Sequence, residues 1–167
     1  MIRVVVDDIA FVSADAVIRP TTTTLEPTSA SLRRLEQVGG PAFWEQLSLQ
    51  SELAVGSAVV TAAGDLSADF VVHAVISSAD LPVTTQQVKQ ALTSALQRAG
   101  DWQLTRVAIP PVGTGAGNLQ MEDAAQVMVD VISAAMTAAT CPREVLIVVD
   151  SEEDRAVFDL YLKRLPQ

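Results

Sequence analysis

The segment best suited to ligand chemistry is the glycine-rich stretch Gly113–Asn118, which reads Gly-Thr-Gly-Ala-Gly-Asn. Glycine tolerates positive φ and lets the backbone approach a ligand closely, so successive N–H groups can point at one anion. The stretch lies between a β-branched run that ends at Ile109 and a helical pattern that begins near Met121. In open α/β sheets, ligands bind outside the carboxyl ends of strands, where a helix N-terminus adds partial positive charge. The stretch predicts a phosphate-binding loop, although a plain strand-to-helix turn would also explain the pattern taken alone.

Two other phosphate-binding motifs do not fit this stretch. A Walker A loop requires Lys followed by Ser or Thr after its last glycine, and neither is present here. A Rossmann fingerprint belongs in the first strand–helix turn, with an acidic residue about 20 positions later. The glycine stretch instead lies late in the chain, so both motifs are excluded.

Composition restricts the kinds of partner. Twenty acidic residues against 11 basic ones give a formal net charge of −9, so we expect no binding to nucleic acid or to anionic membranes. With this charge, backbone amides rather than a cationic pocket would have to hold a phosphate. A single cysteine, Cys141, and a single histidine, His73, leave no disulfide framework and no zinc cluster. We find no signal peptide and no apolar run of about 18 residues, and therefore expect a cytoplasmic protein without metal or cofactor.

The rest of the sequence supplies the elements that would position the glycine stretch. Short β-branched runs predict strands, and apolar residues at helical spacing predict helices. The expected strands are Ile2–Val6, Asp15–Arg19, Val55–Thr61, Phe70–Ile76, Val107–Ile109 and Val145–Val149. The expected helices are Ala30–Val38, a short one after Pro41, Thr84–Ala99, Met121–Ala138 and Ser151–Leu165. Pro20 is expected to end the second strand, and the Thr-, Ser- and Pro-rich stretch 21–31 to form a loop.

The order of these elements predicts the fold class. Two early strands, a helical stretch, two adjacent strands and then alternating helices and strands indicate an α/β fold, with a mixed central sheet and helices on both faces. No internal repeat or long linker divides the 167 residues, so we expect one domain over 1–167.

Six segments together resemble the macro domain family, whose members bind ADP-ribose and in some branches hydrolyse its derivatives. The segments follow the family's order over nearly the whole chain, which is more specific than any single motif. They are Val6-Asp7-Asp8-Ile9, Asp15-Ala16-Val17-Ile18, Gly56–Leu66, Val71-Val72-His73-Ala74-Val75, Val107–Gly117 and Val145–Asp150. The resemblance implies a macro-domain-like three-layer α/β/α fold.

The resemblance also implies which residues contact a ligand. Asp8 would accept a hydrogen bond from the adenine amino group, for which an acceptor-only carboxylate is suited, and Ile9 would contact the base through its backbone. Val149 stands where many members have an aromatic residue stacked on adenine, and valine can pack there but cannot stack. The glycine loop would enclose the diphosphate and the distal ribose. The implied binding set is Asp8, Ile9, Thr22, Val112, Gly113, Thr114, Gly115, Ala116, Gly117, Asn118 and Val149.

The stretch Arg19–Ala30 departs from the family pattern. Catalytic members have Asn-Ala-Ala-Asn after the second strand and then a run of glycines, which correspond here to Arg-Pro-Thr-Thr and to Pro-Thr-Ser-Ala. Thr22 stands near the Asn that contacts the distal ribose, but a hydroxyl cannot reproduce an amide's two donors and acceptor. Glu26 is the only carboxylate in this stretch, and a loop carboxylate is usually just solvated. We therefore assign no catalytic residue.

Three functions remain open. Asp8 and the glycine loop favour a module that binds ADP-ribose, a related nucleotide or an ADP-ribosylated protein, without efficient hydrolysis. An ADP-ribosyl hydrolase or ADP-ribose phosphate phosphatase would have to use unfamiliar residues between Thr21 and Glu26. A macro-like scaffold that acts through protein contacts would explain Val149 and the altered first loop. His73, alone in an apolar strand, is expected to be a hydrogen-bonded core residue rather than a catalytic one.

Overall fold

A computed structural model describes residues 1–78, 81–115 and 118–166 of the chain. Its centre is a six-stranded sheet in the order β1-β6-β5-β2-β4-β3. The strands are β1 Ile2–Val6, β2 Ala14–Thr22, β3 Ala58–Ala62, β4 Ala68–Ser77, β5 Arg106–Ile109 and β6 Glu144–Val149. Neighbouring strands pair in parallel, except that edge strand β3 is antiparallel to β4. The mixed α/β sheet predicted from the sequence is confirmed.

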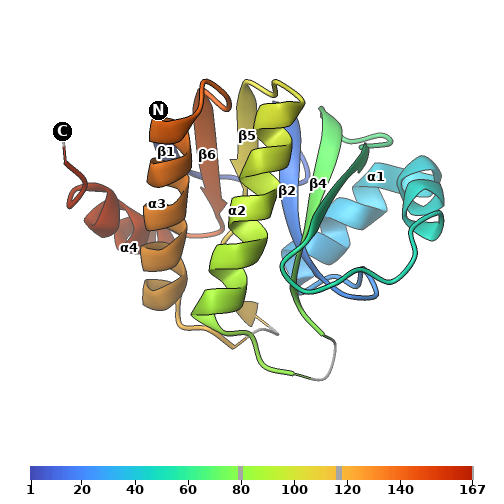
Figure 1. Ribbon diagram of the computed structural model, residues 1–167, viewed down its shortest axis with the longest axis horizontal. Coiled ribbons are helices and arrows are strands. Elements are labelled where there is room, and N and C mark those ends of the chain that lie inside the picture. The colour runs from blue at the N-terminus through green and yellow to red at the C-terminus, as the bar shows by residue number, and fades with distance from the viewer. Residues whose placement is uncertain (79–80, 116–117, 167) are drawn as a thin grey trace.

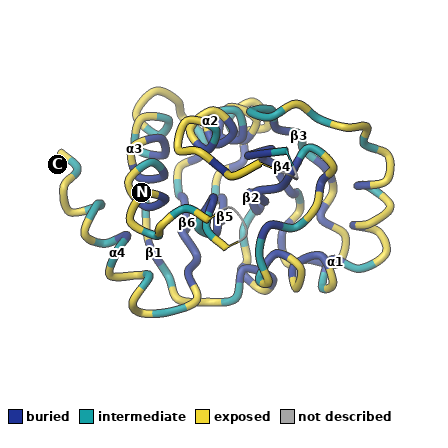
Figure 2. The backbone as a smooth tube through the Cα atoms, turned by 90° about the horizontal axis from the view of Figure 1, so that it is seen from below, coloured by how far each residue is buried: buried dark blue, intermediate teal, exposed yellow. Residues whose placement is uncertain are grey.

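Helices cover the sheet on both faces, which makes three layers (Figure 1). They are α1 Ala30–Ser48, α2 Thr85–Asp101, α3 Met121–Ala138 and α4 Glu152–Leu162. Helices α2 and α3 lie side by side on one face and α1 lies on the other, while α4 flanks α3 at the β1 edge (Figures 1 and 2). Burial is concentrated along the strands and the helix sides that face them (Figure 2).

The sheet separates two apolar cores, because successive side chains of a strand point to opposite faces. In β5, Val107 and Ile109 join the core under α2 and α3, whereas Ala108 between them joins the core under α1. All three side chains are fully buried. Strands that are apolar on both sides are typical of parallel sheets with helices on both faces.

Local signals set the ends of the helices. Thr84 and Gln87 form the predicted capping box of α2, with bonds of 3.2 Å from the Gln87 amide to Thr84 Oγ1 and 3.0 Å from the Thr84 amide to Gln87 Oε1. Ser151 caps α4 by accepting an amide of the first turn at 3.2 Å. Helix α1 is interrupted at Gly40, where φ is +73°, directly before Pro41. It therefore consists of two helical parts, as the Gly-Gly-Pro sequence predicts.

Strand β2 is longer than predicted. The expectation that Pro20 ends this strand is wrong, because β2 continues to Thr22. The ladder between β2 and β5 pairs only Ala16 and Val17, so Pro20 lies beyond it and its missing N–H breaks no bond on that side. Other ends differ by one to three residues; for example, β3 begins at Ala58 rather than Val55, β4 begins at Ala68 rather than Phe70, α2 ends at Asp101 rather than before Gly100, and α4 ends at Leu162 rather than Leu165.

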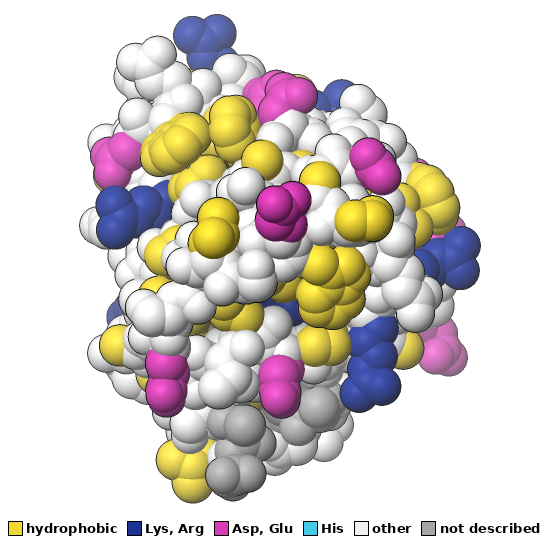
Figure 3. Space-filling model, turned by 90° about the vertical axis from the view of Figure 1, so that its right-hand side faces the viewer, with side chains coloured by type: hydrophobic (Ala, Val, Ile, Leu, Met, Phe, Trp, Pro, Cys, Tyr) yellow, Lys and Arg dark blue, Asp and Glu magenta, His cyan; other side chains and the backbone are white. Residues whose placement is uncertain are grey.

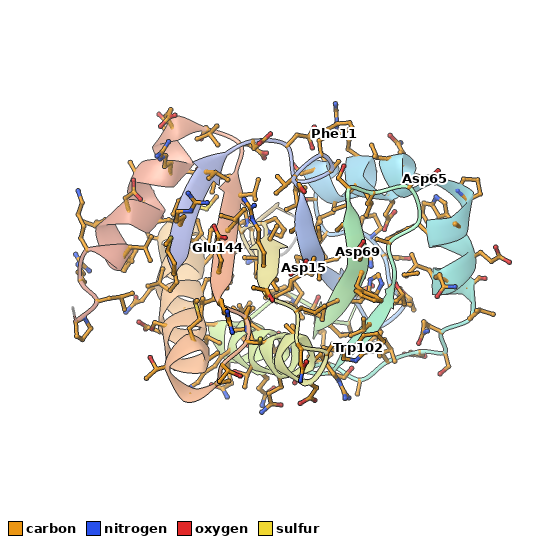
Figure 4. All side chains as sticks on the ribbon, turned by 90° about the horizontal axis from the view of Figure 1, so that it is seen from above. Phe11, Asp15, Asp65, Asp69, Trp102 and Glu144 are labelled. Atoms are coloured by element: carbon orange, nitrogen blue, oxygen red, sulfur yellow. The ribbon has the colours of Figure 1, made fainter. Side chains whose placement is uncertain are left out.

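Two carboxylates tie together the amino edge of the sheet (Figure 4). Asp15 Oδ2 accepts the amides of Thr105 and Arg106 at 2.9 and 2.8 Å, which joins the start of β2 to the start of β5. Glu144 at the start of β6 pairs with Arg3 of β1 at 2.6 Å. These bonds align the strand starts, and the parallel strands therefore end together at the opposite edge.

Candidate functional site

The carboxyl edge of the sheet gathers the segments that the sequence predicts to bind a ligand. The view from below in Figure 2 faces this edge. Strands β1, β2, β5 and β6 end here, followed by Asp8, the segment from Thr22 to Ser29, the glycine stretch and Asp150 respectively. The first turns of α1 lie among them.

The glycine loop requires its glycines. Gly113 and Gly115 have φ of +88° and +70°, a region that L side chains rarely adopt, and Asn118 has φ of +62°. A Cβ on Gly113 would lie 2.6 Å from Leu119 Cδ1, which is shorter than real contacts allow. The loop is closed by bonds from the Asn118 amide to the Gly115 carbonyl (3.1 Å) and from the Leu119 amide to the Gly113 carbonyl (2.9 Å). The predicted ligand residues Ala116 and Gly117 lie outside the described residues.

Several of the predicted contact residues are buried, among them Ile9, Thr22, Val112 and Val149. Val112 has 1% of its surface exposed, and its N–H donates to Met128 Sδ at 3.3 Å. Val149 is fully buried, pairs with Val6 in the sheet, and accepts the Asp7 amide at 3.1 Å through its carbonyl. The side chains of Val112 and Val149 belong to the core under α2 and α3, and their contact with a ligand stays a prediction.

Asp8 presents a partly exposed carboxylate that the first helix holds in place. Its Oδ2 pairs with Arg34 Nε of α1 at 2.7 Å, and its Oδ1 accepts the Ala10 amide at 3.0 Å. The Arg34 guanidinium also lies over the Phe11 ring, 5.5 Å from its centroid. A carboxylate has about four acceptor positions, so Asp8 keeps capacity for a further donor. The side chain of Ile9 beside it is buried in the core under α1.

The segment after β2 folds into a closed turn that uses its own polar groups. Thr22 Oγ1 accepts the Glu26 amide at 3.2 Å and lies 3.3 Å from Thr24 Oγ1. Thr21 Oγ1 donates to the Glu26 carbonyl at 2.8 Å, and Thr21 forms an isolated bridge with Pro27. Leu25, at the tip of the turn, has φ of +64° and a buried side chain. The Thr22 hydroxyl, predicted to contact ribose, is thus engaged inside the turn, while Glu26 is exposed.

The start of α1 contacts the other three segments. Ser29 caps the helix by accepting the Leu32 amide at 3.3 Å. Ser31 Oγ donates to Asp150 after β6 at 3.1 Å, and Arg34 reaches Asp8 after β1. A Cβ on Gly115 would lie 3.1 Å from the carbonyl oxygen of Thr28, just before the cap. The structure therefore brings Asp8, the first loop and the glycine loop together around one helix N-terminus.

Beneath the turn lies a buried polar network that sequence reasoning did not assign to the site. Arg19 is fully buried, pairs with Glu36 of α1, and donates to the Leu25 carbonyl at 2.7 Å through Nη2. Its Nη1 lies 3.3 Å from His73 Nδ1, and His73 Nε2 lies 2.8 Å from Thr61 Oγ1. Because Arg19 can only donate, His73 Nδ1 accepts and Nε2 carries the proton. His73 is a hydrogen-bonded core residue in this arrangement.

The environment of this network changes its pKa values. Burial raises the pKa of Glu36 and lowers that of Arg19, while their mutual attraction acts in the opposite direction on each. Burial, and then the charge of Arg19, lowers the pKa of His73 to about 3. His73 is therefore neutral at physiological pH. Two signals in the sequence mark this pair. One is the charged Arg19 in the apolar strand β2, and the other is Glu36 on the apolar stripe of α1.

Two hollows lie elsewhere on the surface, and the second is lined in part by Thr23, Thr24 and Leu25 of the first loop. A groove of about 950 Å³ runs between α2 and α3, and a pocket of about 400 Å³ lies beside Trp44. The side of the molecule that faces the viewer in Figure 3 has hydrophobic side chains near its middle and scattered acidic and basic ones around them. Neither hollow is lined by Asp8 or by the glycine loop.

Within the described residues, no group of three or more His, Cys, Asp or Glu side chains is placed to hold a metal ion. No helix in the described part of the chain has the length and apolar character needed to cross a membrane.

Comparison with known proteins decides the family. The model of the macro domain family matches residues 28–128, which include α1, β3, β4, α2, β5 and the glycine loop. The chain belongs to the macro domain family. The resemblance seen in the sequence is thereby confirmed.

Relatives of this macro domain differ in length and in name. It is 27% identical to the O-acetyl-ADP-ribose deacetylase of Klebsiella pneumoniae over 170 residues, covering 98% of this chain and 97% of that protein. It is 26% identical over 125 residues to an uncharacterized protein of Mycobacterium tuberculosis, covering 75% of this chain. The chain spans only 35% of that relative's length.

The fold matches solved macro domains. The Trypanosoma brucei macrodomain, solved in complex with ADP-ribose, superposes with a TM-score of 0.86 at 14% identity, covering 96% of this chain and 68% of that one. At this identity the likeness concerns the fold alone. The predicted three-layer α/β/α macro fold is confirmed.

Proposed function

We propose that this macro domain binds ADP-ribose or a related ADP-containing nucleotide at the carboxyl edge of its sheet, without efficient hydrolysis. The observation that carries the proposal is the convergence of Asp8, the glycine loop and the N-terminus of α1. The ADP-ribose complex of the T. brucei macrodomain and the name of the K. pneumoniae relative support the ligand class.

The adenine and the diphosphate of such a ligand have chemical counterparts here. The Asp8 carboxylate, held by Arg34, is suited to accept a hydrogen bond from the amino group of adenine. The amides of the loop around Gly113 and Gly115, and the first amides of α1, which lack intrahelical partners, are suited to the diphosphate. The first turn of α1 holds no acidic residue that would repel it. Backbone amides suit a chain with a net charge of −9, because they bind anions without a cationic pocket.

The polar groups of the first loop argue against efficient hydrolysis. The hydroxyl of Thr22 accepts the Glu26 amide inside the turn, which occupies one of its acceptor positions, and a neutral hydroxyl is not a general base. Glu26 is exposed, and nothing in the described residues holds its carboxylate toward the glycine loop. A general base must lie within hydrogen-bonding reach of the proton it removes.

A second candidate function is hydrolysis of an ADP-ribose derivative, which the name of the K. pneumoniae relative favours. It predicts turnover of O-acetyl-ADP-ribose that is lost in Thr22→Ala or Glu26→Gln. Binding without turnover in the unchanged protein supports the binding module instead. We further propose that the protein binds its ligand in the cytoplasm. An ADP-ribosylated protein is a further ligand class for the same site.

The substitution Gly115→Glu tests the proposed site. It places a carboxylate beside the loop amides and should abolish ADP-ribose binding measured by calorimetry. Gly115 is exposed, so the variant should still unfold cooperatively on heating. Unchanged affinity in a folded variant would place the ligand elsewhere on the protein.

A further inference from the structure

The face of the molecule formed by α2 and α3 carries the larger of the two hollows. Its groove of about 950 Å³ extends over residues 85–101 of α2 and 123–138 of α3. The two helices connect β4 to β5 and β5 to β6, which are parallel, so they run in the same direction and lie side by side (Figure 1). Since an α-helix rises 1.5 Å per residue, the groove is about 22 Å long, or about four helical turns.

The exposed side of α3 along this groove lacks the charges expected of a helix that faces only water. Asp130 is the last charged residue of α3, and residues 131–142 contain no charged side chain. Ala134 and Ala138 are nevertheless exposed, and Ala135 is half-buried. A helix that remains in solvent normally has charged and polar residues on its outer face. Small apolar side chains at these positions instead allow another helix to pack closely.

The groove is acidic along its whole length. Asp123 and Asp130 line it on α3 and Asp101 lines it at the far end of α2, while Lys89 is its one cation, so three negative charges and one positive give a charge of −2. All four side chains are exposed, and among the described residues none of them forms an ion pair. Asp123 and Asp130 are seven residues apart, so they lie on one side of α3 about 10 Å apart along its axis. Cations two helical turns apart on a partner helix would meet both carboxylates.

The shape and charge of the groove favour one kind of occupant. Within the described residues no aromatic side chain lines it, and its carboxylates are spread from end to end, whereas a small-molecule pocket has an apolar or aromatic lining and a few converging polar groups. A second copy of this chain is disfavoured, because two acidic grooves would face each other in a symmetric dimer. An amphipathic helix can lay its apolar face into such a groove and place basic residues beside the acidic walls.

We propose that the groove between α2 and α3 binds an amphipathic helix of a partner protein, about four turns long, with small or aliphatic residues on one face and Lys or Arg beside them. The apolar face covers Val127, Ala134 and Ala138, and the basic side chains pair with the three carboxylates. The inference is independent of the nucleotide site, because neither Asp8 nor the described part of the glycine loop lines this groove.

Two fluorescein-labelled peptides test the proposal. The first is an alanine- and leucine-based helix of about 15 residues with Lys residues two turns apart, and the second has Glu in place of each Lys. In fluorescence anisotropy at low salt, the Lys peptide should bind with a micromolar Kd and the Glu peptide at least tenfold more weakly. High salt should weaken binding of the Lys peptide, since exposed charges are screened. No binding of the Lys peptide at millimolar protein, or equal binding of both peptides, overturns the proposal.

A variant of the groove tests where the peptide binds. Ala134→Lys places a long cation on the floor of the groove and should weaken the Lys peptide at least tenfold. The matched control Ala156→Lys makes the same change at an exposed position of α4, outside the groove, and should keep the Kd. Equal peptide affinity in the two variants overturns the proposed place of binding.

Two further measurements separate this proposal from other accounts. Both variants should keep the ADP-ribose affinity of the unchanged protein, so the peptide test and the nucleotide titration succeed or fail separately. Sedimentation velocity should show a monomer. A dimer that Ala134→Lys dissociates would identify a second copy of this chain as the occupant and overturn the partner helix.

Discussion

Replacing Gly115 by alanine separates the backbone geometry of the glycine loop from the charge that Gly115→Glu introduces. The φ of Gly115 is +70°, and an L residue in this region loses about 1–2 kcal/mol of stability. The new Cβ would lie 3.1 Å from the Thr28 carbonyl oxygen, so the two loops must separate by a few tenths of an ångström. We expect a free energy of unfolding lower by about 2 kcal/mol in total. For a domain of this size that corresponds to a melting temperature lower by about 4–8 °C.

The same substitution should weaken nucleotide binding. A loop that rotates Gly115 out of its left-handed conformation turns its amide away from the anion. The loss of one such hydrogen bond corresponds to about 1.5 kcal/mol, or roughly a tenfold rise in the Kd for ADP-ribose. Calorimetry gives the Kd, and thermal unfolding gives the stability.

Gly56→Ala is the matched control for Gly115→Ala. Gly56 also has positive φ, +92°, but a Cβ there would meet Gln90 at an ordinary 3.4 Å, beside α2. This control should lose stability through backbone strain and keep the Kd of the unchanged protein. Equal affinity in Gly115→Ala and the unchanged protein would refute the assignment of this loop to the ligand.

Three further perturbations test other parts of the site. Asp8→Ala should weaken ADP-ribose binding about tenfold and remove the preference for it over the hypoxanthine analogue, measured by calorimetry, because the acceptor for the amino group is lost; a preserved preference would contradict this role. Arg19→Ala should lower the free energy of urea unfolding by about 3–5 kcal/mol, since it leaves Glu36 buried and unpaired, and Arg19→Met/Glu36→Met should recover a large part of that loss; equal losses would show that the pair is not coupled. Because the pKa of His73 falls from 6.5 to about 3 on folding, the unfolded chain binds a proton between these pH values and the native one does not, so stability is full above pH 6.5 and falls toward pH 3 by up to about 1.4 kcal/mol per pH unit. His73→Gln should lack this component when unfolding is followed between pH 4 and 7, and identical slopes would place the titration elsewhere.

Sequence periodicity was sufficient for the parts of the fold that depend on local pattern. The buried run of β5 and the apolar stripe of α3, Met121–Ala138, place the glycine loop at the carboxyl edge of the sheet. The positive φ of Gly113 and Gly115 follows from the same pattern, because glycine alone adopts it freely. These features depend on residues that are neighbours in the chain, so the sequence pattern is enough to predict them.

The features that close the site depend on partners far apart in the chain. Nothing in the sequence tells which carboxylate neutralises Arg19, and Glu36 does so only because α1 packs its apolar stripe over β2. The contact between Gly115 and Thr28 likewise joins two loops that the chain does not connect directly. Pro20 reads locally as a strand end, yet the β2–β5 ladder stops before it and the strand continues. Such contacts are tertiary, and local pattern does not determine them.

Titration of the unchanged protein with ADP-ribose tests the central claim most directly. A single site with a Kd in the micromolar range, about −8 kcal/mol, is expected. At a hundredfold excess over the Kd, binding should add about 2.7 kcal/mol of stability and raise the melting temperature by about 5–10 °C. Neither heat nor a melting shift at millimolar ADP-ribose would contradict the account and favour a macro domain that acts through protein contacts alone.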